Sequence, residues 1–380
     1  MSAPFRKKLS FSNIGAVYVL LVIIAIFSIW LPDTFPDLAT VKQILNGNAV
    51  LAMIALSLLI PLTAGTFDLS TAYTASFSGV LVAKLIVADV PLELAVLISL
   101  AAALAIGLMN GLVVVVLKVD SFIGTLATSS LILALISMVT GDRTIQDPKL
   151  SGRFLDIGQQ TLFGLTLPVY YTLIIAGVIW YLLEATATGR RLYATGFNER
   201  TARLAGVRVD KLRFGSLIAS AFIGGIAGIV LTSILGSGTP SAGPPYLLPA
   251  FAAVFLGATQ FRGGRFNVPG TLIAILLLGT GIIGLGLAAQ PPWMQNMFTG
   301  VVLIASLAAA GVQRRKTGYS SWWKRRTQQP DAAREEPGNG DGSVVTVGPQ
   351  GAQPSVDAGM RPQSVTTNPA ATPSSRETGG

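Results

Sequence analysis

The sequence predicts an all-α polytopic membrane protein from its hydropathy, its low charge content and the length of its apolar runs. The mean hydropathy is +0.62, and 51% of the residues are hydrophobic while 12% are charged. A soluble domain carries about 25% charged residues, so this chain is short of the polar surface that a globular protein needs in water. Apolar runs of roughly 18 residues or more recur, which is long enough to cross a hydrocarbon layer about 30 Å thick.

About ten apolar segments follow one another within residues 14–312, the predicted transmembrane domain. The first is longer than the core of a cleaved signal peptide and ends in Trp30-Leu31-Pro32, which indicates a retained helix. A short amphipathic piece follows near 38–45. The eighth segment is short for a complete span, and the sequence leaves open whether it crosses fully. The segments are 14–31, 49–64, 69–87, 92–117, 122–140, 168–183, 214–235, 247–261, 269–288 and 293–312.

Basic residues gather in every second loop, and this pattern predicts the orientation of the chain. With residues 1–13 in the cytoplasm, the basic loops at Lys118, at 189–213, at Arg262 and Arg265 and at 314–316 all fall inside, as the positive-inside rule requires. We therefore expect about ten spans with both termini in the cytoplasm. The net charge of +9 is interpreted as this topology signal and not as a sign of nucleic-acid binding.

The composition changes abruptly after the last apolar segment. Residues 313–326 are basic and aromatic, which is typical of a juxtamembrane segment that lies on anionic lipid headgroups. Residues 327–380 are mostly Pro, Gly, Ser, Thr, Gln and charged residues without an apolar period. Such a composition cannot bury enough apolar surface to order itself, so we expect a disordered cytoplasmic tail.

The long basic loop at 189–213 contains a short helix with both ends marked. Asn198 can accept a hydrogen bond from the first turn, and Gly206 can adopt the left-handed conformation that ends a helix. Glu199 lies in the first turn and four residues before Arg203, which favours an ion pair. A helix of roughly two turns is not stable alone in water, so the pattern predicts that a partner docks on it.

Polar side chains at membrane depth are the candidate pathway residues, because polar groups in hydrocarbon are costly and tend to mark function. Asp68 either lies on such a pathway or caps the third segment by bonding near Ser70 and Thr71. Asn110 either contacts a solute or, as we favour, bonds to a neighbouring helix. The hydroxyl groups either line a route for a hydroxylated solute or bond to the preceding turn. The set is Asp68, Ser70, Thr74, Ser78, Asn110, Thr125, Thr128 and Ser129.

Glycine motifs within the apolar segments predict helix packing. Gly107/Gly111 and Gly224/Gly228 are pairs four residues apart, which allow backbones to approach closely. The stretch 279–284 fits a dinucleotide-binding pattern literally, but it lies inside an apolar segment with no preceding strand, so we reject that function.

The chain contains no cysteine and no histidine, which excludes thiol nucleophiles, disulfides, imidazole bases and the usual zinc sites. It also has no Walker A phosphate-binding loop. We therefore expect no metal, no bound cofactor and no catalytic residue, and the chain is not expected to be an enzyme. Any ATP-driven work must use another polypeptide.

Short motifs in order along the chain carry a resemblance. They are 65–70 (GTFDLS), 110–112 (NGL), 122–128 (FIGTLAT), 189–199 (GRRLYATGFNE), 202–207 (ARLAGV), 256–258 (LGA), 263–265 (GGR) and 269–271 (PGT). Together they resemble the permease subunits of bacterial ATP-binding-cassette importers of the ribose/galactose type, within a superfamily that includes branched-chain amino-acid permeases.

This resemblance implies a permease subunit that moves a small polar solute, a sugar, into the cytoplasm. It implies that residues 198–206 form a coupling helix docked on a separate ATPase, which binds the ATP, with Asn198, Glu199, Ala202, Arg203, Leu204 and Gly206 at the contact. An extracytoplasmic solute-binding protein, a second permease copy or a related permease, and the bacterial inner membrane complete the expected setting. The alternative is a secondary transporter driven by an ion gradient, which should show acids paired with bases in mid-span.

Overall fold

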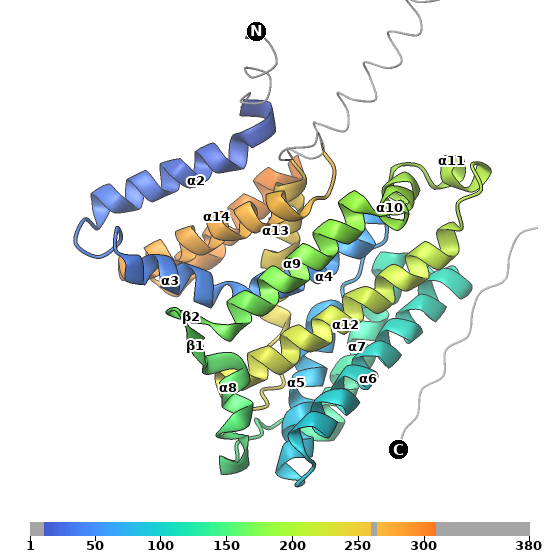
Figure 1. Ribbon diagram of the computed structural model, residues 1–380, viewed down its shortest axis with the longest axis horizontal. Helices are drawn as coiled ribbons and strands as arrows, with labels where there is room; N and C mark the ends of the chain where they lie inside the picture. The colour runs from blue at the N-terminus through green and yellow to red at the C-terminus, as the bar shows by residue number, and fades with distance from the viewer. Residues whose placement is uncertain (1–10, 260–263, 309–380) are drawn as a thin grey trace, which may run out of the picture. The chain divides into compact units, whose positions relative to one another are not determined.

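The computed structural model describes residues 11–259 and 264–308, and it is helical within each of the ten predicted apolar segments (Figure 1). The predicted segments 313–326 and 327–380 lie outside the described residues. The helices are α2 (Phe11–Trp30), α4 (Ala49–Thr63), α5 (Thr71–Val87), α6 (Leu92–Gly111) with a π-helical continuation η1 (Leu112–Val116), α7 (Ser121–Thr140), α9 (Leu167–Ala185), α12 (Val209–Leu235), α13 (Leu247–Ala258), α14 (Val268–Leu287) and a stretch at 292–308.

Shorter elements occupy the connections. They are α3 (Leu38–Gly47), η2 (Pro148–Leu150), α8 (Arg153–Gln159), the antiparallel strands β1 (Thr161–Leu162) and β2 (Leu165–Thr166), α10 (Ala187–Phe197), α11 (Glu199–Leu204) and η3 (Pro244–Tyr246). The amphipathic piece predicted near 38–45 is α3, which buries Thr40 and Ile44. Helices α10 and α11 form most of the segment 189–213, which the sequence analysis described as a basic loop.

Five helices in the described residues are long and apolar enough to cross a membrane, and the bent pair α3–α4 would make six. The two parts of that pair meet at an angle of 44°. The chain is thus an all-α, multi-pass membrane protein. The count of ten spans and the cytoplasmic position of both termini stay predictions. Helix α13, in the eighth segment, is one of the shorter apolar helices, as its sequence suggested.

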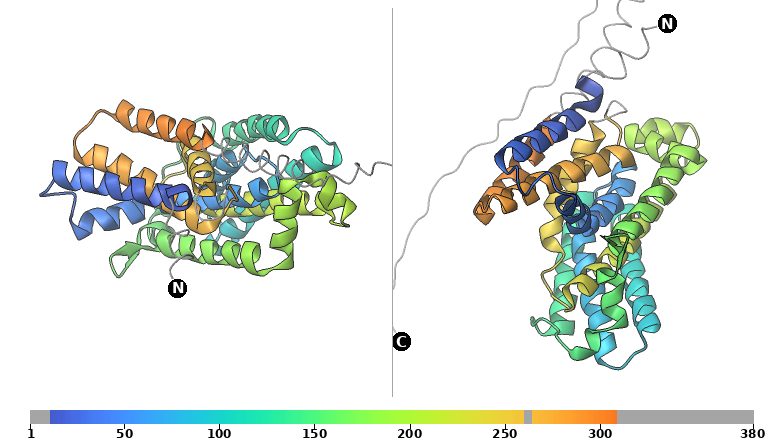
Figure 2. Two further views of the ribbon diagram at one scale, coloured as in Figure 1. Left: turned by 90° about the horizontal axis from the view of Figure 1, so that it is seen from above. Right: turned by 60° about the vertical axis from the view of Figure 1, so that its left-hand side comes forward.

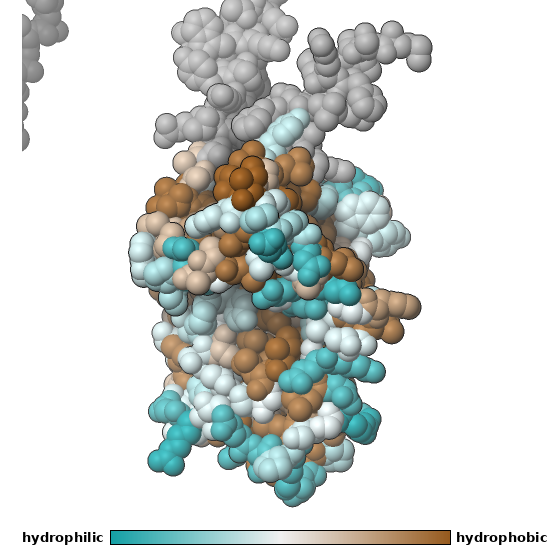
Figure 3. All heavy atoms as spheres, turned by 90° about the vertical axis from the view of Figure 1, so that its left-hand side faces the viewer, coloured by the Kyte–Doolittle hydropathy of each residue, from teal (hydrophilic) through white to brown (hydrophobic). Residues whose placement is uncertain are grey.

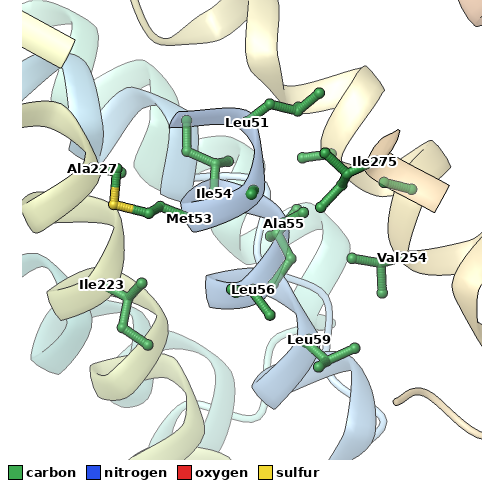
Figure 4. Packing of buried hydrophobic residues seen from close by; sticks show 14 of the residues in the cluster. Leu51, Met53, Ile54, Ala55, Leu56, Leu59, Ile223, Ala227, Val254 and Ile275 are labelled. Atoms are coloured by element: carbon green, nitrogen blue, oxygen red, sulfur yellow. The ribbon is translucent and has the colours of Figure 1, made fainter. Parts of the chain in front are cut away.

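Helix α4 is the centre of the hydrophobic core. All 15 of its residues are buried, and a helix that is apolar all round is typical of a position enclosed by other helices. Figure 4 shows Ile223 and Ala227 of α12 on one side of α4, and Val254 of α13 and Ile275 of α14 on the other. The views in Figure 2 agree with this central position. The C-terminal end of α4 is therefore fixed by helices from several parts of the chain.

Small residues allow α5, α6 and α12 to cross at very short range. A Cβ atom added to Gly228 of α12 would lie 1.9 Å from the Ala75 carbonyl oxygen of α5. A Cβ atom on Gly107 would lie 2.8 Å from the Cα of Ile218 on α12. The glycine pairs thus serve helix packing, as predicted. Gly279 and Gly284 of the rejected dinucleotide pattern likewise pack against Asn48 and Phe27.

The polar connection at 141–166 is docked against the helices. Phe154 of α8 is 2% exposed, and its carbonyl oxygen accepts a 2.5 Å hydrogen bond from Ser233 of α12. The loop carries three acids, Asp142, Asp147 and Asp156, and three bases, Arg143, Lys149 and Arg153, so its charge is balanced. Two of the bases pair outside the loop, each at 2.7 Å: Lys149 with Asp89, between α5 and α6, and Arg153 with Glu93, in the first turn of α6. Packing places both acids beside the loop.

Large apolar side chains also face outward along the helices. Leu97, Met138 and Ile174, on α6, α7 and α9, are all more than half exposed. On the face in Figure 3, hydrophobic surface lies open in the middle while hydrophilic residues gather toward the lower end. Soluble monomers rarely expose apolar surface on this scale, whereas lipid chains cover it in a membrane protein.

Replacing Gly228 with valine should destabilise the protein, because the new side chain would overlap the Ala75 backbone at the crossing of α5 and α12. Overpacking of this kind costs roughly 1–3 kcal/mol or more. Thermal unfolding in detergent should show a lower midpoint for Gly228→Val. Gly177→Val is the matched control, since a Cβ atom there meets nothing within 4 Å. Equal midpoints for the two variants would contradict this account of the crossing.

Candidate functional site

The basic loop folds into α10 and α11, and the predicted caps of the short helix are present. The Asn198 side chain accepts a 3.0 Å hydrogen bond from the amide of Thr201. At the other end, Gly206 has φ +79°. The amide of Val207 donates to the Ala202 carbonyl oxygen at 3.0 Å, which completes a glycine stop of the usual type. Local residues alone therefore define where α11 begins and ends.

Ion pairs tie α11 to the start of α12. Arg203 lies 2.9 Å from Glu199, as the four-residue spacing predicted, and it also bonds to Asp210 at 3.0 Å. Hydrogen bonds raise the pKa of Arg203 above its ordinary value; the bond to Asp210 contributes most, and the bond to Glu199 contributes next. Glu199 accepts a second partner, Arg213, at 2.9 Å. Arg203 is thus charged at any physiological pH and helps to hold the short helix against α12.

Two apolar side chains stand out from this charged segment. Phe197 and Leu204 are 89% and 84% exposed; Phe197 is the last residue of α10, and Leu204 is the last residue of α11. Ala202 is 4% exposed, so its methyl group faces the rest of this chain. Leu204 was among the predicted contact residues, whereas the sequence analysis did not select Phe197. The signal that could have found it is a lone aromatic residue among charged and polar neighbours.

Several of the predicted pathway residues lie at a break between α4 and α5 at 64–70, or contact it. The backbone there is not helical, and side chains accept hydrogen bonds from three of its amides. The backbone amide of Phe67 donates to Ser121 Oγ at 3.1 Å, and the backbone amide of Leu69 donates to Thr125 Oγ1 at 3.0 Å. Both acceptors belong to α7, so this helix supports the break from the side.

A buried chain of hydrogen bonds runs through the break. Asn110 Nδ2 of α6 donates to Ser70 Oγ at 2.7 Å, and Ser70 Oγ donates to Asp68 Oδ1 at 2.6 Å. Asp68 Oδ1 also accepts from the amide of Ser70 at 3.0 Å. All three side chains are 0% exposed. Asn110 thus bonds to the residue that precedes α5, and Asp68 accepts from the amide and the hydroxyl of Ser70, as its capping alternative predicts.

Of the other predicted pathway hydroxyls, all except Ser78 bond to the preceding turn of their own helix. Thr74, Thr128 and Ser129 donate to carbonyl oxygens four residues earlier, at 2.9, 3.1 and 2.8 Å. Their hydrogen atoms are therefore used within their own helices. Thr125 donates to Ser121 O in the same way at 2.7 Å and also supports the break.

Among the described residues, four buried polar side-chain atoms have no hydrogen-bond partner. They are Thr66 Oγ1, Asp68 Oδ2, Ser78 Oγ and Asn110 Oδ1. Leaving a buried polar group unpaired costs roughly 1–3 kcal/mol, so such atoms require an explanation. Asp68 and Asn110 each use one side-chain atom in the hydrogen-bond chain and leave the other free to accept. We call Thr66, Asp68, Ser70 and Asn110 the break cluster; it has spare capacity for hydrogen bonds.

Comparison with known proteins identifies the family. Residues 40–307 match the family model described as the permease component of branched-chain amino acid transport systems. This chain belongs to that family. The match agrees with the resemblance inferred from the motifs, and no solved structure matches the chain.

Several permeases resemble this one along most of their length. The ribose import permease protein of Haemophilus influenzae is 31% identical over 292 residues, which cover 76% of this chain and 90% of the relative. The L-arabinose transport system permease protein of Escherichia coli is 31% identical over 305 residues, 80% of this chain and 92% of the relative. The D-allose transport system permease protein of Escherichia coli is 28% identical over 306 residues, 80% and 93% respectively.

The hydrogen bond between Asn110 and Ser70 should be measurable by a double-mutant cycle with alanine. Residues in direct contact show interaction energies of about 0.5–3 kcal/mol in such cycles. We expect the Ser70→Ala and Asn110→Ala effects on the free energy of unfolding to be non-additive within that range. A matched cycle of Ser70→Ala with Thr128→Ala should be additive, because Thr128 bonds within α7. Additivity in the first cycle would contradict the buried chain.

Proposed function

We propose that this permease is the membrane subunit of an ATP-binding-cassette importer that carries a small polar solute, a sugar, into the cytoplasm. Its family membership supports this, together with the named solutes of its relatives, which are ribose, L-arabinose and D-allose. The observation that carries the proposal is the capped helix α11, which ends in the exposed Leu204 and is preceded by the exposed Phe197.

In this proposal a cytoplasmic ATPase docks on residues 198–206 and on the adjoining Phe197. Exposed apolar side chains on a rigid, capped helix are suited to filling pockets on a partner, and aromatic anchors commonly carry much of the binding energy. Phe197 and Leu204 would be those anchors, while Ala202 would support the helix from inside. The ATP would be bound by the ATPase and not by this chain. Both termini would lie on the same cytoplasmic side, with ten spans between them.

The outer end would receive solute from an extracytoplasmic binding protein. Helix α8 and the β1–β2 hairpin belong to the loop that the charge pattern places outside, and Thr166 ties the hairpin to Asn46 of α3 with a 2.9 Å bond from its amide. A second copy or a related permease would complete the pathway in the bacterial cytoplasmic membrane. The free acceptor atoms of Asp68 and Asn110 are suited to hydroxyl donors.

One observation favours a second candidate, a transporter driven by an ion gradient. Asp68 is a fully buried acid, and acids in membrane interiors often carry protons or ions. Against this, no described basic side chain forms the ion pair with Asp68 that such a transporter is expected to show. Asp68 also accepts two hydrogen bonds from Ser70, which suit a capping role. The importer is the function that the capped segment supports better.

Phe197→Glu should release the ATPase that copurifies with the permease from its native membrane. A charge in place of an apolar anchor should lower recovery of the ATPase at least about tenfold, since losing a hot-spot contact costs roughly 2 kcal/mol or more. ATP-dependent uptake into vesicles should fall in parallel. Phe163→Glu is the matched control, because Phe163 is also 89% exposed but lies on the β1–β2 hairpin.

Two results would overturn this assignment. Full recovery of the ATPase with Phe197→Glu and Leu204→Glu combined would show that α11 is not the joint. If a preparation free of ATPase takes up sugar into liposomes when an ion gradient is imposed, the protein is a secondary transporter instead.

A further inference from the structure

Arg213 connects the short helix α11 to the end of α4. Its Nη2 atom lies 2.9 Å from Glu199 Oε2, in the first turn of α11. Its Nε atom lies 3.5 Å from the carbonyl oxygen of Ala64, which follows the last residue of α4. The side chain is 25% exposed, so it is held between these partners and not free in solvent. A planar guanidinium can bond in two directions at once, which a lysine ammonium does less specifically.

A backbone contact lies beside this bridge. A Cβ atom added to Gly196, near the end of α10, would lie 2.2 Å from the Thr63 carbonyl oxygen and 3.1 Å from the Gly65 amide nitrogen. Gly65 itself has φ +74°, which a glycine adopts without strain. Protein interiors packed at this distance transmit displacement instead of absorbing it. A shift of α10 and α11 must therefore move the end of α4 or open this contact.

The break at 64–70 begins at the atom that Arg213 contacts. It is non-helical, and two of its amides are held by α7 side chains instead of by helical hydrogen bonds. Thr66 Oγ1 and Asp68 Oδ2 in the break, and Asn110 Oδ1 beside it, have no partner among the described residues. A segment with unmet hydrogen-bond capacity is suited to a second arrangement in which that capacity is used.

We propose that Arg213 is the positioning residue that carries movement of α11 to the break at 64–70, and that the break is the element that switches. This inference rests on the proposed function, because it assumes that an ATPase moves α11. Docking shifts Glu199, Arg213 transfers the shift to Ala64, and the break cluster exchanges its hydrogen bonds. Coupling between distant sites requires such a two-state element that both sites can bias.

The neighbouring basic residues do not form this connection. Arg203 bonds to Glu199 and Asp210, which keeps it within α11 and the first turn of α12. Lys211 is exposed on α12 and has no ion pair among the described residues. Lys211→Ala therefore removes the same charge two residues away without touching the bridge, and it is the matched control for Arg213→Ala.

The first experiment measures coupling in the complete transporter reconstituted in liposomes with its copurified ATPase and binding protein. Arg213→Ala should retain the ATPase and hydrolyse ATP within about twofold of the parent, while uptake falls at least about tenfold. Arg213→Lys should lose about threefold, since it keeps the charge but not the planar fork. Lys211→Ala should behave as the parent. Uptake by Arg213→Ala within twofold of the parent would overturn the proposal, and so would parallel loss of ATPase binding and uptake.

The second experiment observes the break directly, using the natural absence of cysteine from this chain. Thr66→Cys places a single small thiol in the break, and its rate of reaction with a maleimide is followed in the complex. Mg-ATP with vanadate should change that rate at least about fivefold. Adding Arg213→Ala should reduce the change to less than twofold, whereas adding Lys211→Ala should preserve it.

The outcomes separate this inference from the proposed function. If no ATPase accompanies the parent permease, the importer itself is wrong. If the parent couples uptake to ATP but the thiol rate does not respond to nucleotide, the break is not the switching element. If the thiol responds equally with and without Arg213, movement reaches the break by another route and Arg213 is not the link.

Discussion

A backbone amide that leaves a helix needs another hydrogen-bond partner, and three amides of the break between α4 and α5 find theirs on side chains. Hydroxyl groups of Ser121 and Thr125 from α7 hold two of its amides, and Asp68 holds a third. The non-helical backbone is possible only because α7 packs beside it. The buried bond from Asn110 to Ser70 then fixes α6 against the same point. Three helices thus depend on one irregular stretch.

Glycine residues allow close contacts between the backbones of neighbouring helices. Gly228 lets α12 meet α5 at the distance of touching backbones, and Gly196 does the same for α10 against the end of α4. Contacts this short leave no flexible side chain to absorb motion. The exposed segment at α11 and the break cluster are therefore joined by a rigid path, with Arg213 across it. This physical continuity relates the exposed side chains of Phe197 and Leu204 to buried polar atoms.

Several features followed from the sequence because their causes are local. The caps of α11 are fixed by residues within a few positions of each other, so Asn198 and Gly206 were sufficient to place both ends. The orientation of Ala202 was not predictable, since it depends on what α11 packs against. Likewise the partner of Lys149 is Asp89, 60 residues away, and not an acid in its own loop.

By itself, the sequence determined the membrane class, the positions of the apolar helices, the packing role of the glycines and the presence of a capped helix in a basic loop. These properties depend on apolar length, on helical spacing and on hydrogen bonds within one turn. Only the tertiary structure decided which polar groups are already satisfied. Thr74 and Asn110 look alike as polar residues in apolar runs, yet Thr74 bonds within its own turn and Asn110 bonds to a residue 40 positions away. That difference depends on which helices meet, because a buried polar group is defined by its partner and not by its own type.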